Sequence, residues 1–523
     1  MATRSKLGKT ISSMAKIAVT RGLGLVLAMG VSSLLANRLG TSAPADAFFL
    51  ARRLAVGFSE AANRISNVML VPGLVAILST GDVGRVRKVW HSYQLRAMLW
   101  LLPAAGVCAL ASPWIIHVAG PGLEPDTAHL ASGLLRVLLF IIPVTVFRAI
   151  SGAMLNAGRV FGVPELMAQF SRFLVIMALL LLVPPYGVTF LAWTMLVGSL
   201  LAALSLTLIT DRSLGRIKPR KKPGTGDSGN GPGRLFLPGL LVFGTNQALI
   251  WFEFGIASKL GEGNIATYEY ANRLMAILPG LIAASLTTVM YTEFSHQMAR
   301  GERQEMYRSL ARSLRSGLFI LAPVVAFLAF QGEAIARLLL HHGRFDAEAV
   351  KITARTMHMV AFAGVGTFIS RVLLYSVYAD KDIKVMRLVL SAMVVKVVAR
   401  IALVLLLVGP LGVAGIALGR SLSILVRMLV IFLLLYKVWG RFLRLSDIRN
   451  MILVLVITAV SMGSTLYLNR LMTWTMDGSF WIRLLGVSVA AVVGFGLFLG
   501  LSALVRLPEL KALKGMIRRR KAA

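Results

Sequence analysis

Ionisable side chains inside long apolar segments are the residues of this sequence most able to do chemistry. A charge at the centre of a membrane-spanning helix costs about 2.5–3.5 kcal/mol on insertion scales, so it needs a compensating partner or a function. The basic members of this set outnumber the acidic members, which leaves positive charge for an external anion. A guanidinium group matches phosphate in both charge and geometry. The basic residues are Arg21, Arg52, Arg53, Arg64 and Arg273, and the acidic residues are Glu60, Glu253 and Glu269.

Two interpretations of these charges are open. Pairing with the glutamates, or extension to the membrane surface, would explain any single arginine. A cavity between two halves of the protein that binds an anionic, phosphate-bearing substrate would explain the whole set. Lys396 and Arg400 lie four residues apart and share a helical face. They could extend this basic cavity or reach the cytoplasmic surface, and we expect the second.

The sequence lacks the motifs of enzymes, nucleotide-driven pumps and metal proteins. It contains no P-loop, no Walker-type lysine and no constellation typical of a catalytic triad. His341 and His342 are adjacent residues in a predicted loop, without helical i, i+4 spacing or further ligands, so they do not indicate a metal site. The single cysteine, Cys108, excludes an internal disulfide. We therefore predict a protein that is not an enzyme and has no catalytic residues, no metal and no cofactor.

The elements that carry these charges are predicted to be membrane-spanning helices. Hydrophobic residues make up 57% of the 523 residues and charged residues only 15%, against about 25% charged in an average soluble domain. Because a span needs about 20 apolar residues, the apolar segments predict an all-α polytopic membrane protein with about 14 transmembrane helices. The predicted spans are 12–38, 46–78, 91–116, 128–155, 163–184, 187–211, 235–260, 266–295, 308–330, 348–378, 384–409, 411–436, 448–470 and 479–505.

The positions of lysine and arginine predict the topology. The formal net charge is +34, but the cations gather in alternate short connections between spans, which is the pattern of cytoplasmic loops rather than of a nucleic-acid-binding surface. The connections around 120–127, 184–186 and 409–411 hold no cation. Both termini are basic, so we expect both to be cytoplasmic, in agreement with an even number of spans.

The chain divides into two similar halves. Residues 212–234 have the glycine-, proline- and lysine-rich composition of a flexible cytoplasmic linker. Pro185-Tyr-Gly-Val188 recurs as Pro410-Leu-Gly-Val413, and Ala51-Arg-Arg-Leu54 recurs as Ala271-Asn-Arg-Leu274, at offsets of 225 and 220 residues. These matches predict two six-helix pseudo-repeats, with a transport site between the halves. The predicted parts are an N-lobe (1–211), the linker (212–234), a C-lobe (235–437), two further helices (438–505) and a basic cytoplasmic tail (506–523).

Six short motifs stand in the order seen in one family. They are Arg21-Gly-Leu-Gly24, Ala45-Asp-Ala-Phe-Phe49 with Arg53, Tyr270-Ala-Asn-Arg-Leu274, Gly343-Arg-Phe-Asp-Ala-Glu348, Tyr378-Ala379 with Asp382, and Pro410 to Leu418. Through about residues 10–436 the sequence resembles the MurJ (MviN) lipid II flippases, of the MOP exporter superfamily that also contains the MATE transporters.

The resemblance implies a function and a location. It implies a flippase of the bacterial inner membrane that moves undecaprenyl-diphosphate-linked peptidoglycan precursor (lipid II) from the inner to the outer leaflet by alternating access. Expected partners are this anionic lipid-linked glycan, membrane lipids and cell-wall synthesis proteins, with no nucleic acid. The family arginines that contact the diphosphate match Arg21, Arg53 and Arg273, and residues 438–505 match the helix pair that forms a groove for the lipid tail.

The sequence departs from the family pattern at several positions. Leu27 stands where members usually carry a second arginine, and Arg64 where they carry an acid. Asn272 replaces the usual aspartate, Met386 replaces a proline, and Glu253 replaces an aspartate on the seventh span. We expect Arg52, Arg64, Glu60, Glu253, Glu269 and Asn272 to contribute to the same cavity. A flippase for another polyprenyl-diphosphate-linked oligosaccharide, a cation-coupled antiporter of the MATE type and a non-transporting scaffold remain alternatives.

Overall fold

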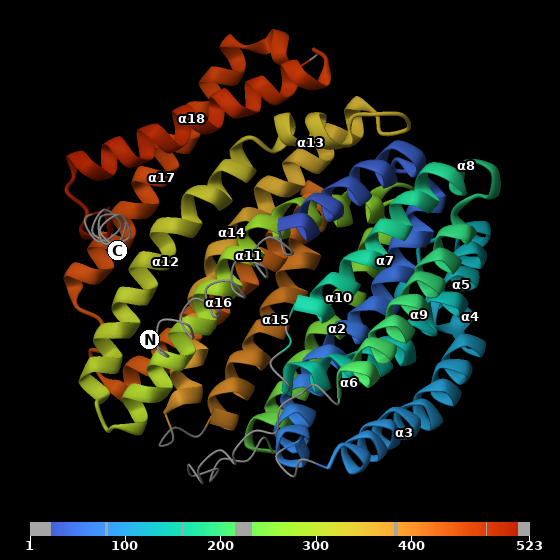
Figure 1. Cartoon of the computed structure of the whole chain (residues 1–523). Coiled ribbons are helices and arrows are strands. Elements are labelled where there is room, and N and C mark those ends of the chain that lie inside the picture. Colours follow the sequence, from blue (N-terminus) through green and yellow to red (C-terminus); the bar gives the residue numbers. More distant parts are fainter. Residues whose placement is uncertain are drawn as a thin grey trace, which may run out of the picture. The chain divides into compact units, whose positions relative to one another are not determined.

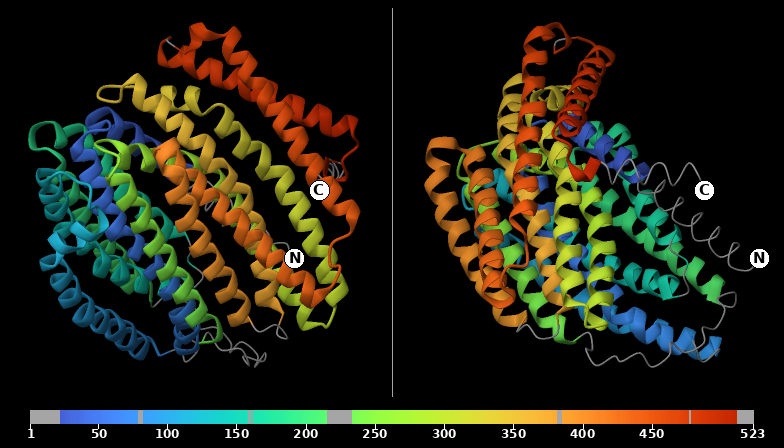
Figure 2. Two further views of the ribbon diagram at one scale, coloured as in Figure 1. Left: turned by 180° about the vertical axis from the view of Figure 1, so that it is seen from behind. Right: turned by 90° about the vertical axis from the view of Figure 1, so that its left-hand side faces the viewer.

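The computed structural model describes residues 22–78, 82–157, 160, 162–214, 233–380, 385–476 and 478–510. Within these ranges the backbone is helical and contains no β-strand (Figures 1 and 2). Side chains are not described at a few further helical positions, chiefly 59–73 of the second span. The termini, most of the 212–234 linker and most of the 506–523 tail lie outside the described ranges, and their predicted cytoplasmic location stays a prediction.

Within the described residues, each of the fourteen predicted spans corresponds to a helix, and residues 12–21 of the first span lie outside them. Ten helical segments of the described residues are long and apolar enough to cross a membrane, and the other four predicted spans are α2, α7, α10 and α11. The first span is the helix Gly22–Leu39. The others are α2 (Ala43–Leu78), α3 (Val83–Leu110) with α4 (Ser112–Ala119), α5 (Pro125–Leu139) with α6 (Ile141–Ala157), α7 (Gly162–Leu181), α9 (Val188–Ser213), α10 (Gly233–Ser258), α11 (Asn264–Ala299), α12 (Arg303–Phe330), α14 (Ala347–Ala379), α15 (Val385–Leu411), α16 (Val413–Trp439), α17 (Leu445–Leu471) and α18 (Phe480–Leu504). Short helices α8 (Val183–Tyr186), α13 (Gly332–Leu340) and η2 (Thr473–Thr475) complete the order.

Some helices begin earlier than the apolar segments that predicted them. The third span was expected to start at residue 91, but α3 starts at Val83 because the Asp82 carboxylate accepts a hydrogen bond from the Arg85 amide at 2.9 Å and caps the helix. The basic residues expected in the preceding connection therefore lie in the first turns of α3. Hydrophobicity marks the membrane-embedded length, whereas capping sets the helix end.

Two compact units account for the described contacts. The first contains Met1–Ala266 with His342–Arg344, and the second contains Thr267–His341 with Phe345–Ala523. In the first, α2 packs on α5 and α6, and a buried cluster around Trp90 and Met154 joins α2, α3 and α6. In the second, α14 and α15 pack on α16, while α12 packs on α17, which packs on α18. The division into an N-lobe (1–211) and a C-lobe (235–437) that the sequence predicts stays a prediction.

The repeated Pro-x-Gly-Val motif forms the same turn in both units. Gly187 and Gly412 have positive φ values of 75° and 58° and directly precede α9 and α16. A side chain in this left-handed region costs about 1–2 kcal/mol, so glycine is the residue that fits. The sequence match thus has a structural counterpart.

Many large apolar side chains face outward. Trp100 on α3 and Trp481 and Val492 on α18 are at least 74% exposed. In a soluble protein such surfaces would favour aggregation, whereas in lipid they are the expected outer face of a membrane helix.

Candidate functional site

Arg53 is the predicted diphosphate ligand that the structure describes in the first unit. It lies on α2, between the buried residues Ala51 and Leu54, and is itself half-buried. Its Nε is buried and has no hydrogen-bond partner among the described residues. A buried guanidinium nitrogen without a partner is costly, so this group is well placed to bind an anion.

Helix α10 packs against the same part of α2. A Cβ at Gly57 would collide with the Gln247 side chain, and Phe58 forms edge contacts with Phe243 and Trp251 at centroid distances of 6.0 and 6.2 Å. Gly57 is one helical turn beyond Arg53 and therefore shares its face of α2. Glycine at this position permits the close approach of the two helices.

Glu253 lies on α10 and is fully buried. The start of α2 meets the segment that follows α10, because the Asp46 carboxylate accepts hydrogen bonds from the amides of Gly263 and Ala266, both at 2.7 Å. The two helices are therefore antiparallel, and Glu253 and Arg53 lie at similar depths in the first unit.

Arg273 lies on α11 in the second unit and forms an ion pair. Its Nε donates to Glu269 Oε1 at 3.0 Å, one helical turn earlier, with 15% of the Arg273 side chain and 7% of the Glu269 side chain exposed. The pairing interpretation of the sequence therefore applies to this arginine. The compensation is local, because both residues belong to the same helix.

Asn272 is held by a residue that the sequence analysis did not select. The Asn272 side-chain amide donates to the Tyr268 carbonyl oxygen at 2.8 Å, and Arg420 of α16 donates to Asn272 Oδ1 at 3.0 Å. Arg420 also donates to the Tyr268 hydroxyl at 3.4 Å. Arg420 is a charged residue eight positions into α16, so the rule that marked the other intramembrane arginines would have found it.

A family model named lipid II flippase MurJ matches residues 35–485. The chain belongs to the lipid II flippase MurJ family. A lipid II flippase MurJ of Burkholderia cenocepacia is 24% identical over 440 residues, which cover 79% of this chain and 81% of that protein. A probable lipid II flippase MurJ of Vibrio cholerae is also 24% identical, over 97% of each chain.

Solved structures show the same fold. A lipid II flippase MurJ in an inward closed conformation matches with a TM-score of 0.69 and 22% identity over 93% of this chain and 98% of that one. A MATE family multidrug transporter of the MOP superfamily, in its inward-facing conformation, matches with a TM-score of 0.53 and 18% identity over 82% of this chain and 98% of that one. The predicted fold class is confirmed.

Two of the motifs shared with the MurJ family fix connections in this structure. Asp46, of the Ala45 to Phe49 motif, binds the amides at the start of α11 as described above. Gly343 has a φ of 62°, and a Cβ there would collide with the Asn37 side chain, while the Arg344 amide donates to the Asn37 carbonyl at 3.1 Å. Asp382 lies outside the described residues.

The remaining predicted site residues have different outcomes. Arg21 lies outside the described residues, and Glu60 and Arg64 belong to α2 at positions whose side chains are not described. Arg52 is half-buried beside Arg53 on α2. The expectation for Lys396 and Arg400 is wrong, because they are only 5% and 3% exposed and lie inside the second unit. Packing of α15 on α16 encloses this face of the helix.

Proposed function

We propose that this chain is a flippase that moves undecaprenyl-diphosphate-linked peptidoglycan precursor from the inner to the outer leaflet by alternating access. The observation that carries the proposal is the charge around Arg53, a half-buried arginine with a partnerless Nε on a transmembrane helix of a MurJ-family fold. The relatives in this family are named as lipid II flippases. The chain acts as a transporter and not as an enzyme.

Diphosphate recognition follows from the chemistry of the arginines. A guanidinium group donates two parallel hydrogen bonds to phosphate oxygens, and each charged hydrogen bond contributes about 1.5–3 kcal/mol. In this proposal Arg53 binds the diphosphate as an arginine without an ion pair to a described residue, whereas Arg273 binds the diphosphate while it stays paired with Glu269. Arg21 is the third proposed ligand. The pair α17 and α18 accommodates the lipid tail, which an apolar outer surface suits.

A complementation experiment tests this function. The chain is expressed in a bacterium depleted of its own lipid II flippase, and the appearance of lipid-linked precursor in the outer leaflet is followed together with growth. Growth with restored precursor export is expected, and the Arg53→Ala variant serves as the inactive control. Full membrane insertion without export would contradict the proposal.

A flippase for another polyprenyl-diphosphate-linked oligosaccharide is the second candidate. Leu27 favours it, because this half-buried residue of the first helix stands where family members usually carry an arginine. Reconstituted protein offered lipid II and a different polyprenyl-diphosphate glycan distinguishes the two substrates. A MATE-type antiporter for cationic cargo fits less well, since Arg53 would repel such cargo.

We also propose that both termini and the 212–234 linker are cytoplasmic. The support is the distribution of lysine and arginine over the connections. A Ser228→Cys substitution in a Cys108→Ala background should resist labelling by an impermeant thiol reagent in intact cells, and should react after the membrane is opened. Labelling in intact cells would overturn the topology.

A further inference from the structure

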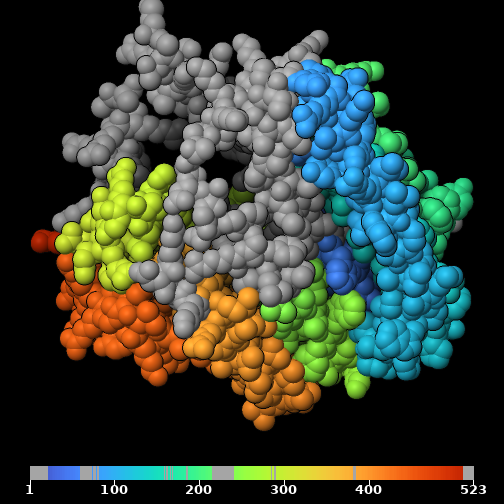
Figure 3. All heavy atoms as spheres, turned by 90° about the horizontal axis from the view of Figure 1, so that it is seen from below, coloured from blue at the N-terminus to red at the C-terminus, as the bar shows by residue number. Residues whose placement is uncertain are grey.

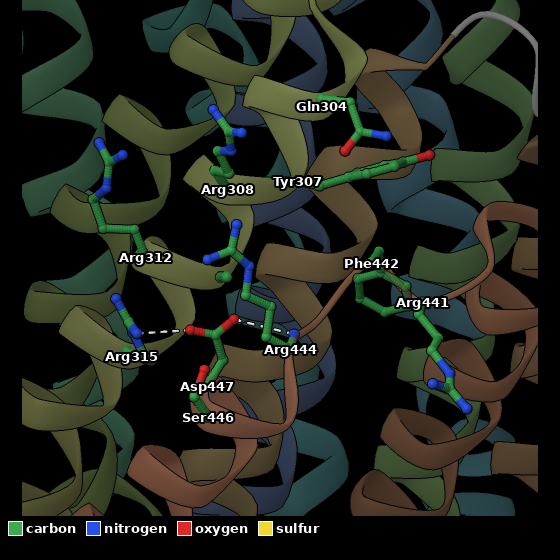
Figure 4. Close-up of a pocket in the computed structure, with 11 residues that line it drawn as sticks. Gln304, Tyr307, Arg308, Arg312, Arg315, Arg441, Phe442, Arg444, Ser446 and Asp447 are labelled. Atoms are coloured by element: carbon green, nitrogen blue, oxygen red, sulfur yellow. Dashed lines mark hydrogen bonds and ion pairs between the residues drawn. The ribbon is translucent and has the colours of Figure 1, made fainter.

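A basic pocket opens in the second unit, and its lining contains none of the proposed diphosphate ligands. It has a volume of about 380 Å³ and lies between the first half of α12 and the connection from α16 to α17 (Figure 4). In Figure 3 the start of α12, in yellow-green, and the start of α17, in orange-red, are neighbours at one end of the molecule. The lining residues are Gln304, Tyr307, Arg308, Ala311, Arg312, Arg315, Arg441, Phe442, Arg444, Ser446 and Asp447.

The acidic groups of this region are already engaged. Arg315 Nη1 donates to Asp447 Oδ1 at 2.6 Å, and Arg315 Nε lies 3.1 Å from Glu509 Oε1. The second Asp447 oxygen accepts the Arg444 amide at 3.1 Å and so caps α17. On the exposed side, Glu305 pairs with Arg308 and Arg312 at 3.3 and 3.7 Å.

Five arginines therefore share three carboxylates. The guanidinium groups of Arg441 and Arg444 form no ion pair with a described residue. Figure 4 shows Arg315 and the Arg444 backbone beside the Asp447 carboxylate, with the Arg444 guanidinium group pointing toward Arg308. The Arg441 side chain begins beside Phe442 and points away from these groups. The Arg315–Asp447 pair fixes one wall of the pocket. Arg444, which has no ion pair in the described part of the chain, and Arg308 and Arg312, which share the single carboxylate of Glu305, leave the pocket positively charged.

An aromatic cluster lies beside the pocket and contributes Tyr307 and Phe442 to its lining. Tyr307 lies 5.3 Å from Trp439 and 6.5 Å from Phe442, and Trp439 lies 5.6 Å from Phe442, measured between ring centroids. The Trp439 indole donates to Asp380 at 3.0 Å, which fixes its orientation. Tyrosine and tryptophan gather at the level of lipid headgroups, and the pocket lies at helix ends beside these rings.

We infer that this pocket binds the phosphate group of an anionic phospholipid headgroup. Arg444 and the neighbouring Arg308 and Arg312 supply the charge that phosphate requires. Tyr307 and Phe442 supply an apolar wall for the glycerol and upper acyl carbons. Free phosphate would also bind to the arginines, but it has no apolar part that would contact Tyr307 and Phe442.

The test compares lipids of different charge on the full-length protein. Purified protein is mixed with phosphatidylglycerol or phosphatidylcholine in detergent micelles, and bound lipid is counted by native mass spectrometry. We expect at least a tenfold preference for phosphatidylglycerol. The Arg441→Gln/Arg444→Gln double variant should lose this preference, and because both residues are exposed it should still fold.

Two further variants and one competitor make the result decisive. Arg470→Gln, at the opposite end of α17, should bind lipid as the wild type does. The Arg441→Lys/Arg444→Lys variant should retain part of the preference, since it keeps the charge without the fork. Displacement of phosphatidylglycerol by an equal concentration of inorganic phosphate would identify a free-phosphate site instead. Unchanged lipid binding in the glutamine variant would overturn the proposal.

Discussion

Helices α2 and α11 hold matching arginines in different electrostatic surroundings. Each helix has 36 residues, and Arg53 and Arg273 occupy equivalent positions of the repeated Ala-x-Arg-Leu motif, about ten residues from the helix start. Four residues before Arg273 stands Glu269, which pairs with it. Four residues before Arg53 stands Phe49, a buried apolar side chain. Arg53 therefore lacks the acidic partner one helical turn earlier that Arg273 has on its own helix.

The difference suggests a division of labour between the repeats. A paired arginine is less costly to place in a membrane helix, and it can still offer its remaining N–H groups to a ligand. An arginine without an acidic partner supplies a full positive charge to an anion. We infer that binding energy for the diphosphate comes mainly from the first repeat, and the following predictions test this asymmetry.

The largest expected effect is that of Arg53→Ala. The substitution removes charged hydrogen bonds of about 1.5–3 kcal/mol, which corresponds to at least a tenfold loss of transport. Arg53→Lys should restore activity only in part, because an ammonium lacks the bidentate fork. Export of precursor per inserted protein is the measurement, with exposed Arg85→Ala as the matched control. Wild-type export by the Arg53→Ala variant would remove Arg53 from the site.

Phe49→Glu should give the first repeat the charge pattern of the second. A carboxylate four residues before Arg53 would pair with it, so transport should fall about tenfold. Since Phe49 is buried, Phe49→Gln is the control for polarity without charge. The comparison is export by the two variants at equal insertion. Equal export would mean that the charge on Arg53 does not limit substrate binding.

Glu269→Gln should make the second repeat resemble the first. With Arg273 no longer paired to a carboxylate, binding of a pyrophosphate probe should tighten severalfold, because the pair is only slightly exposed. Isothermal titration of the purified protein measures the affinity. The exposed Glu348→Gln serves as the control. Weaker binding in the Glu269 variant would show that Glu269 orients Arg273 rather than neutralising it.

The smallest effect is expected where the repeats are alike. Gly187→Ala and Gly412→Ala should each lower the free energy of unfolding by about 1–2 kcal/mol, since both glycines have positive φ and open space around the added Cβ. The thermal midpoint of the solubilised protein reports the change, and Gly106→Ala inside α3 should not lower it. A strong inequality between the two glycines would break the proposed equivalence of the turns.

Local features of the sequence determined much of the fold. Each apolar segment predicted a helix because burial in lipid depends on the hydrophobicity of about 20 consecutive residues. The turn glycines were visible as a repeated motif, and the family followed from motif order. The Glu269–Arg273 pair was predictable from i, i+4 spacing alone. Helix ends were less accurate, as at Val83, because a single capping side chain sets them.

Only the tertiary structure decided which charges meet. Arg420 and Asn272 are 148 residues apart in sequence, and Arg315 and Asp447 are 132 apart, so no spacing rule connects them. The burial of Lys396 and Arg400 depends on the helix that covers their face of α15. The sequence determined that charges would lie in the spans, because charge and hydropathy are properties of the residues themselves. Their partners depend on how the helices pack, which is a property of the folded chain.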